Sequence, residues 1–535
     1  MIDEAHCISV WGHNFRPAYR RIINLVNLLP LDTPVLATTA TATKEVESDI
    51  HTQISGKLQI IRGELSRSNF NLRVVNVNNL GEKLIWLGQN IANFPGTGLI
   101  YTGTRNEAEQ VSKWLNHIGI SCKHYHSKVK SEERKEVEKG LLEDTWKCIA
   151  ATNALGMGID KPDIRFIVHT QFPQSPIHYY QEIGRAGRDN KPAEIVLLYN
   201  YDDKQLPEHF IENAKPCEHK YIKIINALKL EMLSLSELTR RVNLYSKEVK
   251  SILNDLLDQN IIRKINLLDG NKYEYVRNAP PFDPKLNHIL KQRKYNELDD
   301  MIDYATTKKG RMKYLCSYLD DKTDILSKNC DNTTLTKLKV NSNEEWNTKL
   351  NTFIENDFPS ISIVTSGSYG VNGFAASYYG DTKVGNILHR CKYVTKKDFP
   401  PYLLNLTLKA FYKEYSSYKF DLILFIPPTV SGTLVQNFSK RVSERLKIPV
   451  SDALKKVRAT KEQKVFENNL LKSDNVKDVF IVDTPSIVTN KAILLIDDIY
   501  DSGATLKEAG KYLTKCGAKL VAPLVIAKTV GGTQD

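Results

Sequence analysis

No two of the eight cysteines in this 535-residue sequence form a C-x-x-C pair, and no apolar run approaches the length of a membrane span. Disulfide frameworks belong to short secreted domains, and a membrane helix needs about 20 consecutive apolar residues. No secretory signal precedes the first recognisable motif. These absences exclude a disulfide scaffold and an integral membrane protein, so we expect a soluble, cytoplasmic protein without a membrane partner.

A phosphate-binding loop of the form G-x-x-x-x-G-K-S/T is also missing from the sequence. The backbone amides and the lysine of this loop hold the β- and γ-phosphates of ATP in many nucleotide hydrolases. Any ATP hydrolysis by the 535 residues alone would have to proceed without these contacts to the phosphates.

Positive charge is in excess, with 74 lysines and arginines against 62 aspartates and glutamates. Basic side chains gain affinity for nucleic acids by releasing counterions from phosphates, so the net charge of +12 favours a polyanionic partner. A generally basic surface is the alternative that charge alone does not exclude. The length exceeds what one hydrophobic core organises, and the ordinary 41% of hydrophobic residues indicates several folded domains.

Short apolar segments alternate with helical ones through residue 199, a pattern typical of a parallel α/β sheet with ligand groups at its strand ends. The clearest helix of this region is expected over 44–54. The expected buried strands are 34–38, 97–101, 148–152, 164–169 and 194–199.

Beyond Cys217 the pattern changes to three helical segments followed by a β-hairpin. This order describes a winged helix, whose third helix commonly enters the major groove of DNA. A small helical linker domain without a DNA role is the alternative. The expected helices are 220–229, 234–242 and 246–259, and the hairpin strands are 261–268 and 272–276, joined at Asp269-Gly270-Asn271.

The remainder of the chain returns to an α/β pattern. A charged helical segment is expected over 284–320, followed by a polar linker over 331–343. The expected strands beyond this linker are 360–366, 421–427, 479–483 and 492–498.

Two carboxylates open the first motif, Asp3-Glu4-Ala5-His6. Nucleotide hydrolysis needs one acid to organise Mg²⁺ and a second to orient or deprotonate the attacking water. We assign the Mg²⁺ role to Asp3 and the water to Glu4. A motif of this length is weak by itself, and the capped start of a helix would explain it equally well.

The residues that follow make this motif specific. Residues 3–16 read DEAHCISVWGHNFR and resemble the RecQ helicases almost residue for residue, with Val10 in place of the family's usual glutamine. The resemblance implies an aromatic-rich loop that senses single-stranded DNA and couples it to hydrolysis. Its DNA contacts would be Trp11, His13, Phe15 and Arg16, which supply stacking faces and a cation.

Further motifs of the same family follow in order. The segment 181–189 reads QEIGRAGRD, in which the family's arginines reach the γ-phosphate, so Arg188 would be the finger and Arg185 its neighbour. The resemblance implies the catalytic set Asp3, Glu4, His6, Arg185 and Arg188. It also implies DNA contacts at Thr39, Thr41, Thr152 and Asn153, and nucleotide contacts at Gly158, Asp160 and Gln181.

By this resemblance the chain is a 3′-to-5′ DNA helicase of recombination and repair that uses ATP and Mg²⁺. Its partners would be single-stranded DNA and duplex junctions, and its location the bacterial nucleoid. The expected fold class is α/β multidomain. Its domains are an incomplete first RecA-like lobe (1–60), a second RecA-like lobe (61–210), a winged helix (218–280), a helical degenerate zinc module (284–335) and a phosphoribosyltransferase-like domain (345–535).

Two departures from the family pattern stand out. Because the phosphate loop and the strands that should flank Ile2 are missing, we expect an N-terminally truncated helicase that alone neither hydrolyses ATP efficiently nor unwinds DNA. The family's zinc cysteines are replaced, and one thiolate does not hold a structural zinc ion, so we expect no zinc. The four ligand positions hold Gly310, Ser327, Cys330 and Thr333.

A third nucleotide-related motif lies near the C-terminus. Residues 491–505 read KAILLIDDIYDSGAT, an apolar strand, two acids and a small-residue loop that opens a helix. They resemble the phosphoribosyl pyrophosphate motif of type I phosphoribosyltransferases, and residues 456–463 resemble a segment of the ComF-like members. The resemblance implies ribose and Mg²⁺ contacts at Asp497 and Asp498, and 5-phosphate contacts from Asp501, Ser502, Gly503 and Thr505.

The alternative to the helicase is a non-motor DNA-binding protein that uses its C-terminal domain to sense a phosphoribosyl ligand or nucleotide. A salvage enzyme with a vestigial helicase part is a third possibility. No base-recognition motif is apparent in the C-terminal domain, which favours ligand binding over catalysis there.

Overall fold

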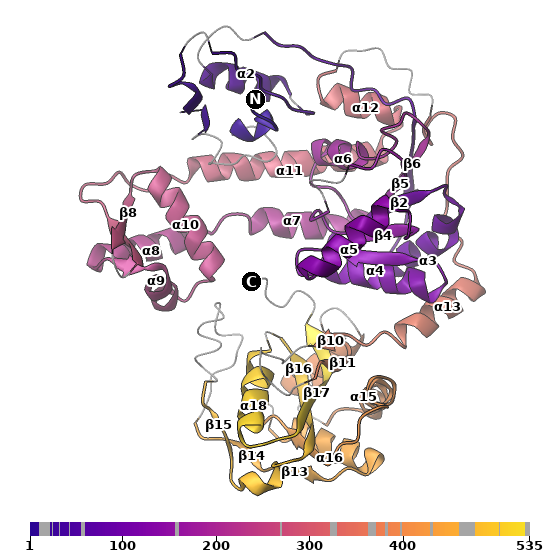
Figure 1. Ribbon diagram of the computed structural model, residues 1–535, viewed down its shortest axis with the longest axis vertical. Helices are drawn as coiled ribbons and strands as arrows, with labels where there is room; N and C mark the ends of the chain where they lie inside the picture. Colours follow the sequence, from indigo (N-terminus) through magenta and orange to yellow (C-terminus); the bar gives the residue numbers. More distant parts are fainter. Residues whose placement is uncertain are drawn as a thin grey trace. The chain divides into compact units, whose positions relative to one another are not determined.

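Figure 1 shows the structure, a computed structural model of the 535-residue chain. It describes all residues except 10–21, 24, 31–32, 42, 55–58, 156–159, 268–269, 322–328, 362–370, 380–382, 396–397, 429–431, 459–476, 502 and 530–535. The chain divides into two compact units, residues 1–214 with 285–353 and residues 215–284 with 354–535. Within the described part, no helix is long and apolar enough to cross a membrane.

The first unit begins with a small cluster rather than a sheet. The expected helix is confirmed as α2 (Lys44–Gln53), whose first turn is capped by the Thr43 side chain. The expected buried strand over 34–38 is wrong, because Ala37 forms only an isolated parallel bridge with Ile2, and Leu36 is 59% exposed. A strand is buried when neighbours cover it on both faces, and among the described residues Ile2 is its one bridging partner.

A six-stranded parallel sheet forms the body of the first unit, in the order β1-β6-β5-β2-β4-β3. The expected strands over 97–101, 148–152, 164–169 and 194–199 are confirmed. The edge strands β1 and β3 were not predicted, because an edge strand needs less apolar sequence than a central one. The bounds are β1 Phe70–Asn76, β2 Thr97–Tyr101, β3 Cys122–Tyr125, β4 Cys148–Ala151, β5 Ile164–His169 and β6 Ala193–Tyr199.

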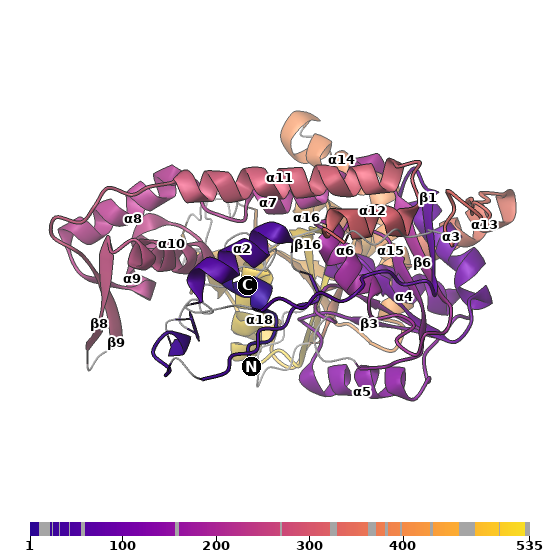
Figure 2. The same ribbon diagram turned by 90° about the horizontal axis from the view of Figure 1, so that it is seen from above.

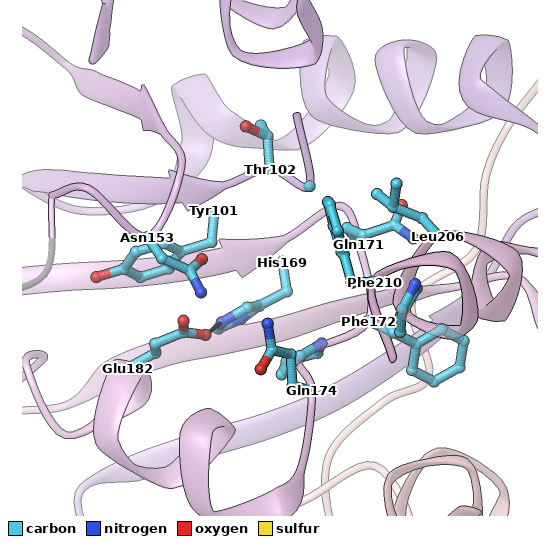
Figure 3. A pocket seen from close by; sticks show the side chains of 13 residues that line it. Tyr101, Thr102, Asn153, His169, Gln171, Phe172, Gln174, Glu182, Leu206 and Phe210 are labelled. Atoms are coloured by element: carbon cyan, nitrogen blue, oxygen red, sulfur yellow. Dashed lines mark hydrogen bonds and ion pairs between the residues drawn. The ribbon is translucent and has the colours of Figure 1, made fainter. Parts of the chain in front are cut away.

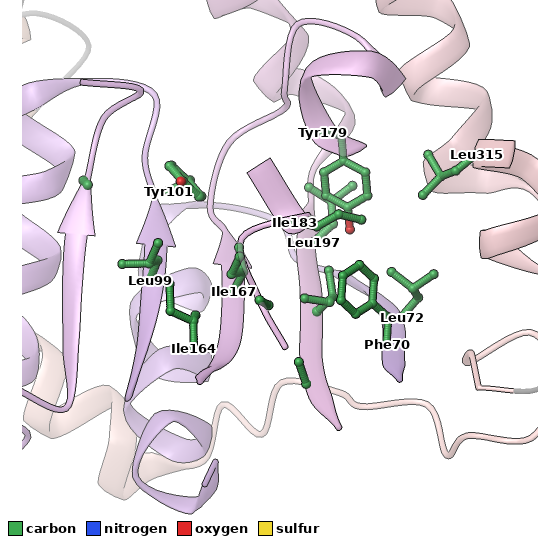
Figure 4. Close-up of a cluster of buried hydrophobic side chains, with 14 of the residues drawn as sticks. Phe70, Leu72, Leu99, Tyr101, Ile164, Ile167, Tyr179, Ile183, Leu197 and Leu315 are labelled. Atoms are coloured by element: carbon green, nitrogen blue, oxygen red, sulfur yellow. The ribbon is translucent and has the colours of Figure 1, made fainter. Parts of the chain in front are cut away.

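Helices cover both faces of this sheet. On one face α5 (Ser131–Leu142), α6 (Pro176–Ile183), α11 (Lys285–Thr306) and α12 (Arg311–Tyr318) close a core with β1, β2, β5 and β6. Figure 4 shows Tyr179 and Ile183 of α6 above the strands, with Leu315 of α12 beside them. Figures 1 and 2 both show α11 running along α6 and α7 (Gln205–Glu212).

On the opposite face, α3 (Leu80–Asn90), α4 (Arg105–His117) and α13 (Glu344–Ile354) form a second core. The ring of Phe353 on α13 lies 5.4 Å from that of Trp114 on α4. The segment 331–343, expected as a linker, is packed here, since Leu338 and Val340 contact the core and Gln89 Nε2 donates to Asn341 O at 2.6 Å.

Within the second unit, residues 218–275 contain the three expected helices and the expected hairpin. The strands form a three-stranded sheet in the order β7-β9-β8, and the helices enclose a core of their own that includes Tyr221, Leu238 and Leu253. The bounds are α8 Glu218–Leu230, β7 Leu233–Ser234, α9 Leu235–Val242, α10 Ser246–Asp258, β8 Ile262–Leu267 and β9 Gly270–Tyr275.

The C-terminal part of the second unit is built on another sheet, in the order β10-β11-β17-β16-β12-β13, in which only β10 is antiparallel. Its strands are β10 Ser360–Ile361, β11 Gly373–Tyr379, β12 Leu422–Phe425, β13 Val450–Ser451, β16 Ala492–Tyr500 and β17 Leu520–Thr529. The main helices are α14 Lys383–His389, α15 Pro401–Glu414, α16 Leu434–Leu446 and α18 Ala504–Lys515.

The outcome of the strand predictions in this part is mixed. The strands over 421–427 and 492–498 are confirmed as β12 and β16, whereas 479–483 forms β15 (Phe480–Val482) in a separate two-stranded sheet with β14 (Leu454–Lys456). Of the strand over 360–366, β10 covers the first two residues, and the rest lies outside the described residues. Strand β17 was missed although it is apolar. It contains Pro523, which normally argues against a central strand, and Gly373 makes room for this ring.

Candidate functional sites

The acidic box lies directly after the bridge between Ile2 and Ala37. Thr38 Oγ1 and the Glu4 backbone N–H both donate to Asp3 Oδ1, each at 2.9 Å. Glu4 adopts a left-handed backbone conformation with φ of 50°. This conformation costs a non-glycine residue roughly 1–2 kcal/mol and is often found at functional sites. Both carboxylates are exposed, as contact with a nucleotide requires.

His6 connects the acidic box to the threonine-rich turn. Its imidazole is almost fully buried, with Nδ1 2.9 Å from Thr39 Oγ1 and 3.3 Å from Glu4 Oε2. The fold therefore brings Glu4, His6 and Thr39 together, which are two expected catalytic residues and one expected DNA contact.

The threonine turn is in turn bonded to helix α6. Gln181 Nε2 donates to the buried Thr41 Oγ1 at 3.0 Å. Helix α6 begins where Ser175 Oγ accepts from the His178 backbone N–H and Pro176 occupies the first helical position. The hydrogen bonds thus run from the acidic box to the helix that immediately precedes Arg185.

The two arginines of the segment 181–189 have different surroundings. Arg188 is partly exposed, and its Nη1 donates to Asp160 Oδ1 at 2.7 Å, so an expected catalytic residue is paired with an expected nucleotide contact. Arg185 lies against the buried Tyr101 hydroxyl, where its charge partly offsets the burial that raises the pKa of Tyr101. The Arg185 Nε atom is buried and has no hydrogen-bond partner among the described residues.

A small cavity of about 60 Å³, lined by both polar and apolar side chains, lies where β2 and β5 end. Figure 3 shows Asn153 beside Tyr101, and Glu182 pointing toward His169, to which it is bonded at 2.8 Å. Ligands of parallel sheets bind at these carboxyl ends of the strands. Of the expected DNA contacts, Asn153 is exposed and lines this cavity, and Thr152 precedes it with its side chain half-buried. The motifs did not single out Tyr101, His169 and Glu182. Tyr101 and His169 end apolar strands, and Glu182 lies inside the segment 181–189, in which the arginines and Gln181 were the expected contacts.

Several expected site residues lie outside the described residues, and the structure does not place them. They are the aromatic-loop residues Trp11, His13, Phe15 and Arg16, together with Gly158, Ser502 and the zinc position Ser327.

Helix α6 also carries a half-buried histidine that the sequence did not single out. Burial, with Lys294 and His6 nearby, lowers the pKa of His178 to about 3. Between pH of about 6.5 and about 3, the imidazole is therefore protonated in the unfolded chain and neutral in the folded chain. Proton binding to the unfolded chain lowers the stability of the fold as the pH falls through this range.

We expect the free energy of unfolding of the first unit to fall by about 2 kcal/mol between pH 7 and pH 5 on account of His178. Denaturant titrations followed by the fluorescence of the buried Trp86 and Trp114 measure it. The variant His178→Gln should lose this dependence, whereas the exposed control His209→Gln should keep it. Equal pH slopes for His178→Gln and the unmodified chain would contradict the assignment.

The acids of the C-terminal motif end the central strand β16. Asp498 is 6% exposed, and its backbone N–H donates to Asp497 Oδ1 at 2.9 Å. Burial, with Asp498 beside it, raises the pKa of Asp497 to about 7. A pair of acids near the carboxyl end of a parallel strand, one buried and one half-buried, is suited to accept hydrogen bonds from vicinal hydroxyl groups.

The loop after β16 opens helix α18. Gly503 has φ of 73°, and a Cβ there would lie 2.6 Å from the Tyr500 hydroxyl, so the turn requires glycine. Thr505 stands in the first turn of α18, where backbone N–H groups and the helix dipole favour an anion. Asp501 Oδ1 accepts from Thr529 Oγ1 at 3.1 Å. Asp497, Asp498, Asp501, Gly503 and Thr505 thus occupy the end of β16, the loop after it and the first turn of α18.

Comparison with known proteins finds the family "Helicase conserved C-terminal domain" over residues 82–190 and "Phosphoribosyl transferase domain" over residues 408–533. The ATP-dependent DNA helicase RecQ of Bacillus subtilis is 40% identical over 215 residues, which are 40% of this chain and 36% of that protein. The probable ATP-dependent DNA helicase RecS of the same organism is 37% identical over 231 residues, 43% of this chain and 46% of that protein.

A mouse protein described as a bifunctional 3′-5′ exonuclease and ATP-dependent helicase, WRN, is 35% identical over 264 residues, 48% of this chain and 19% of that protein. The region with the motor motifs is of the RecQ helicase type. We call residues 1–214 the RecQ-type region and residues 354–535 the phosphoribosyltransferase region. The chain spans less than half the length of each of these relatives.

Proposed function

We propose that the chain supplies motor elements of an ATP- and Mg²⁺-dependent 3′-to-5′ DNA helicase of the RecQ type, acting in recombination and repair. The observation that carries this proposal is a series of polar contacts. His6 Nδ1 lies 3.3 Å from Glu4 Oε2 and 2.9 Å from Thr39 Oγ1, and Gln181 Nε2 donates to Thr41 Oγ1. These contacts join the residues of hydrolysis to the residues of DNA contact, as a motor that couples the two requires.

The residues fit a hydrolytic role in the following way. Asp3 Oδ1 already accepts two hydrogen bonds, and Oδ2 has no partner among the described residues, so it is available to a divalent cation. The cation would neutralise charge on the phosphates. Glu4 would orient the attacking water, and Arg188 would leave Asp160 for the γ-phosphate, where it stabilises the charge that develops in the transition state.

The proposed DNA contacts lie in each unit taken separately: at Asn153, near the ends of β2 and β5, and on the domain 218–280, which we interpret as a winged helix. Exposed arginines and lysines on its helices and hairpin suit phosphate contacts. They are Arg240, Arg241, Lys250, Arg263 and Lys264. Binding to single strands and to duplex junctions, close to the nucleoid, follows from this proposal.

Strand separation tests the motor proposal directly. The 535 residues would be supplied with a first lobe that carries a phosphate-binding loop, by fusion to that of the Bacillus subtilis RecQ protein. We expect ATP-dependent unwinding of a duplex with a 3′ single-stranded tail and little unwinding of one with a 5′ tail. Equal unwinding of both, or ATP hydrolysis that single-stranded DNA leaves unchanged, would reject the proposal.

We further propose that the phosphoribosyltransferase region binds 5-phosphoribosyl 1-diphosphate or a related nucleotide as a ligand rather than turning it over. The acid pair on β16 and the glycine turn before α18 support ribose and phosphate binding respectively. Isothermal titration with 5-phosphoribosyl 1-diphosphate and Mg²⁺ tests this, and absence of heat with the unmodified chain would reject it.

We also propose that the module 284–335 is folded without a zinc ion. Of the four ligand positions, Gly310 caps α12, and Cys330 Sγ lies 3.4 Å from Thr333 Oγ1. In their vicinity the buried Arg311 guanidinium donates to both carboxylate oxygens of Asp331, a contact that cross-links the ends of the module.

A further inference from the structure

A lysine from outside the matched phosphoribosyltransferase domain reaches the acid pair. Lys392 lies in a π-helical turn, Arg390–Thr395, that precedes the matched residues 408–533. Its Nζ lies 2.8 Å from Asp498 Oδ2, and the two side chains are 15% and 8% exposed. A single ion pair that is so withdrawn from solvent requires a reason, because desolvating two charges is costly.

Two lysines act on the acid pair before a ligand arrives. Lys392 contacts Asp498, and both Lys392 and Lys456 of β14 lower the pKa of Asp497, against the larger effects of burial and of Asp498. Burial opposes the charged form of Lys392, yet the adjacent Asp498 outweighs it and raises the pKa of Lys392 above the ordinary value. The lysine is therefore cationic, and Asp498 is engaged before any ligand arrives.

Ribose binding at the acid pair would disturb the ion pair between Lys392 and Asp498. The hydroxyl groups on C2 and C3 of a ribose are donors, and they would take acceptor positions on Asp497 and Asp498 that Lys392 now uses. Lys392 would then be a buried ammonium without a carboxylate partner, which is strongly unfavourable unless another anion replaces it. The carbon next to C2 is C1, so a negative group on C1 would lie within reach of the displaced ammonium.

We propose that Lys392 is a specificity-determining residue that exchanges Asp498 for an anionic group on C1 of the ligand. The site then selects ribose 5-phosphates that carry a diphosphate on C1 over those with a neutral C1 substituent. This inference rests on the proposed binding of a phosphoribosyl ligand. It adds which part of the ligand the region distinguishes and which side chain makes the distinction.

The test is isothermal titration of the full chain with 5-phosphoribosyl 1-diphosphate and, separately, with ribose 5-phosphate, both with Mg²⁺. We expect Lys392→Met to weaken binding of the diphosphate about tenfold or more, the size of one charge-assisted hydrogen bond. Binding of ribose 5-phosphate should stay unchanged or become tighter, because in the variant no buried ammonium is left without an anionic partner.

Two further variants make the comparison secure. Lys392→Arg keeps the charge and should keep the preference for the diphosphate, which separates loss of charge from loss of fold. Lys409→Met removes an exposed lysine, paired with Glu355 in the same region, and should leave both affinities unchanged. Thermal melting of each variant reports that the region is folded.

The outcomes separate this inference from the function on which it rests. If the unmodified chain binds neither compound, the proposed phosphoribosyl site is wrong and the inference falls with it. If it binds both and Lys392→Met weakens both equally, the site stands and the role of Lys392 is rejected. Tighter binding of the diphosphate by Lys392→Met would also reject it, since Lys392 would then act only as a competitor for Asp498.

Discussion

Replacing Arg311 with methionine is expected to lower the free energy of unfolding of the first unit by about 3–5 kcal/mol. The Arg311 side chain is 3% exposed, donates to both oxygens of Asp331, and donates from Nη1 to Tyr304 O at 2.9 Å. Without it, Asp331 would be a buried carboxylate without its ion-pair partner, because the nearby Arg73 is already paired with Glu194. Asp331 Oδ2 also accepts from the Val74 backbone N–H at 3.0 Å, so the loss would extend to the edge strand β1.

Denaturant unfolding followed by tryptophan fluorescence measures this loss. Lys139→Met is the control, because Lys139 forms an exposed ion pair with Glu143 in the same unit and should cost no more than about 1 kcal/mol. The double variant Arg311→Met with Asp331→Leu should recover part of the loss, since it leaves no unpaired charge. A cost for Arg311→Met as small as that of the control would contradict the proposed role.

The metal content of the same purified protein tests whether the module 284–335 needs a metal. We expect elemental analysis to find well under one zinc ion per chain and chelation to leave the unfolding curve unchanged. Stoichiometric zinc would mean that the Arg311–Asp331 pair is an addition to a metal site rather than its replacement.

The second large effect concerns Glu4. In a fusion that supplies the phosphate-binding loop, Glu4→Gln is expected to lower DNA-stimulated ATP hydrolysis about 100-fold or more, the range typical for loss of a general base. The carboxylate orients water, and the amide keeps the shape but accepts no proton. A coupled assay of phosphate release, with and without single-stranded DNA, measures the change.

The comparison needs two further proteins. Glu47→Gln, on α2 outside the acidic box, is the matched control and should keep the rate. The 535 residues alone, which contain no phosphate-binding loop, are expected to hydrolyse ATP close to the background rate. Full activity of Glu4→Gln in the fusion would remove Glu4 from the mechanism, and strong activity of the 535 residues alone would show that this chain grips ATP in another way.

How much the sequence reveals depends on whether a feature is local. Strands β2, β4 and β5 are mostly apolar and buried along nearly their whole length, so their positions follow from composition. The edge strands β1 and β3 were missed, because each carries polar residues between its apolar ones. The strand expected over 34–38 failed for the opposite reason, since an apolar run is buried only where other strands cover it.

The motif residues were found because each motif is a short run whose order carries the chemistry. The sequence by itself therefore determined the RecQ-type region, the acid pair on β16 and the glycine turn before α18. The tertiary structure alone decided which distant residues meet, such as Thr41 with Gln181, Arg311 with Asp331, and Lys392 with Asp498. No short-range pattern in the sequence indicates these pairs, because they depend on how sheets and helices pack. A buried charge is stabilised by the partner that this packing places beside it.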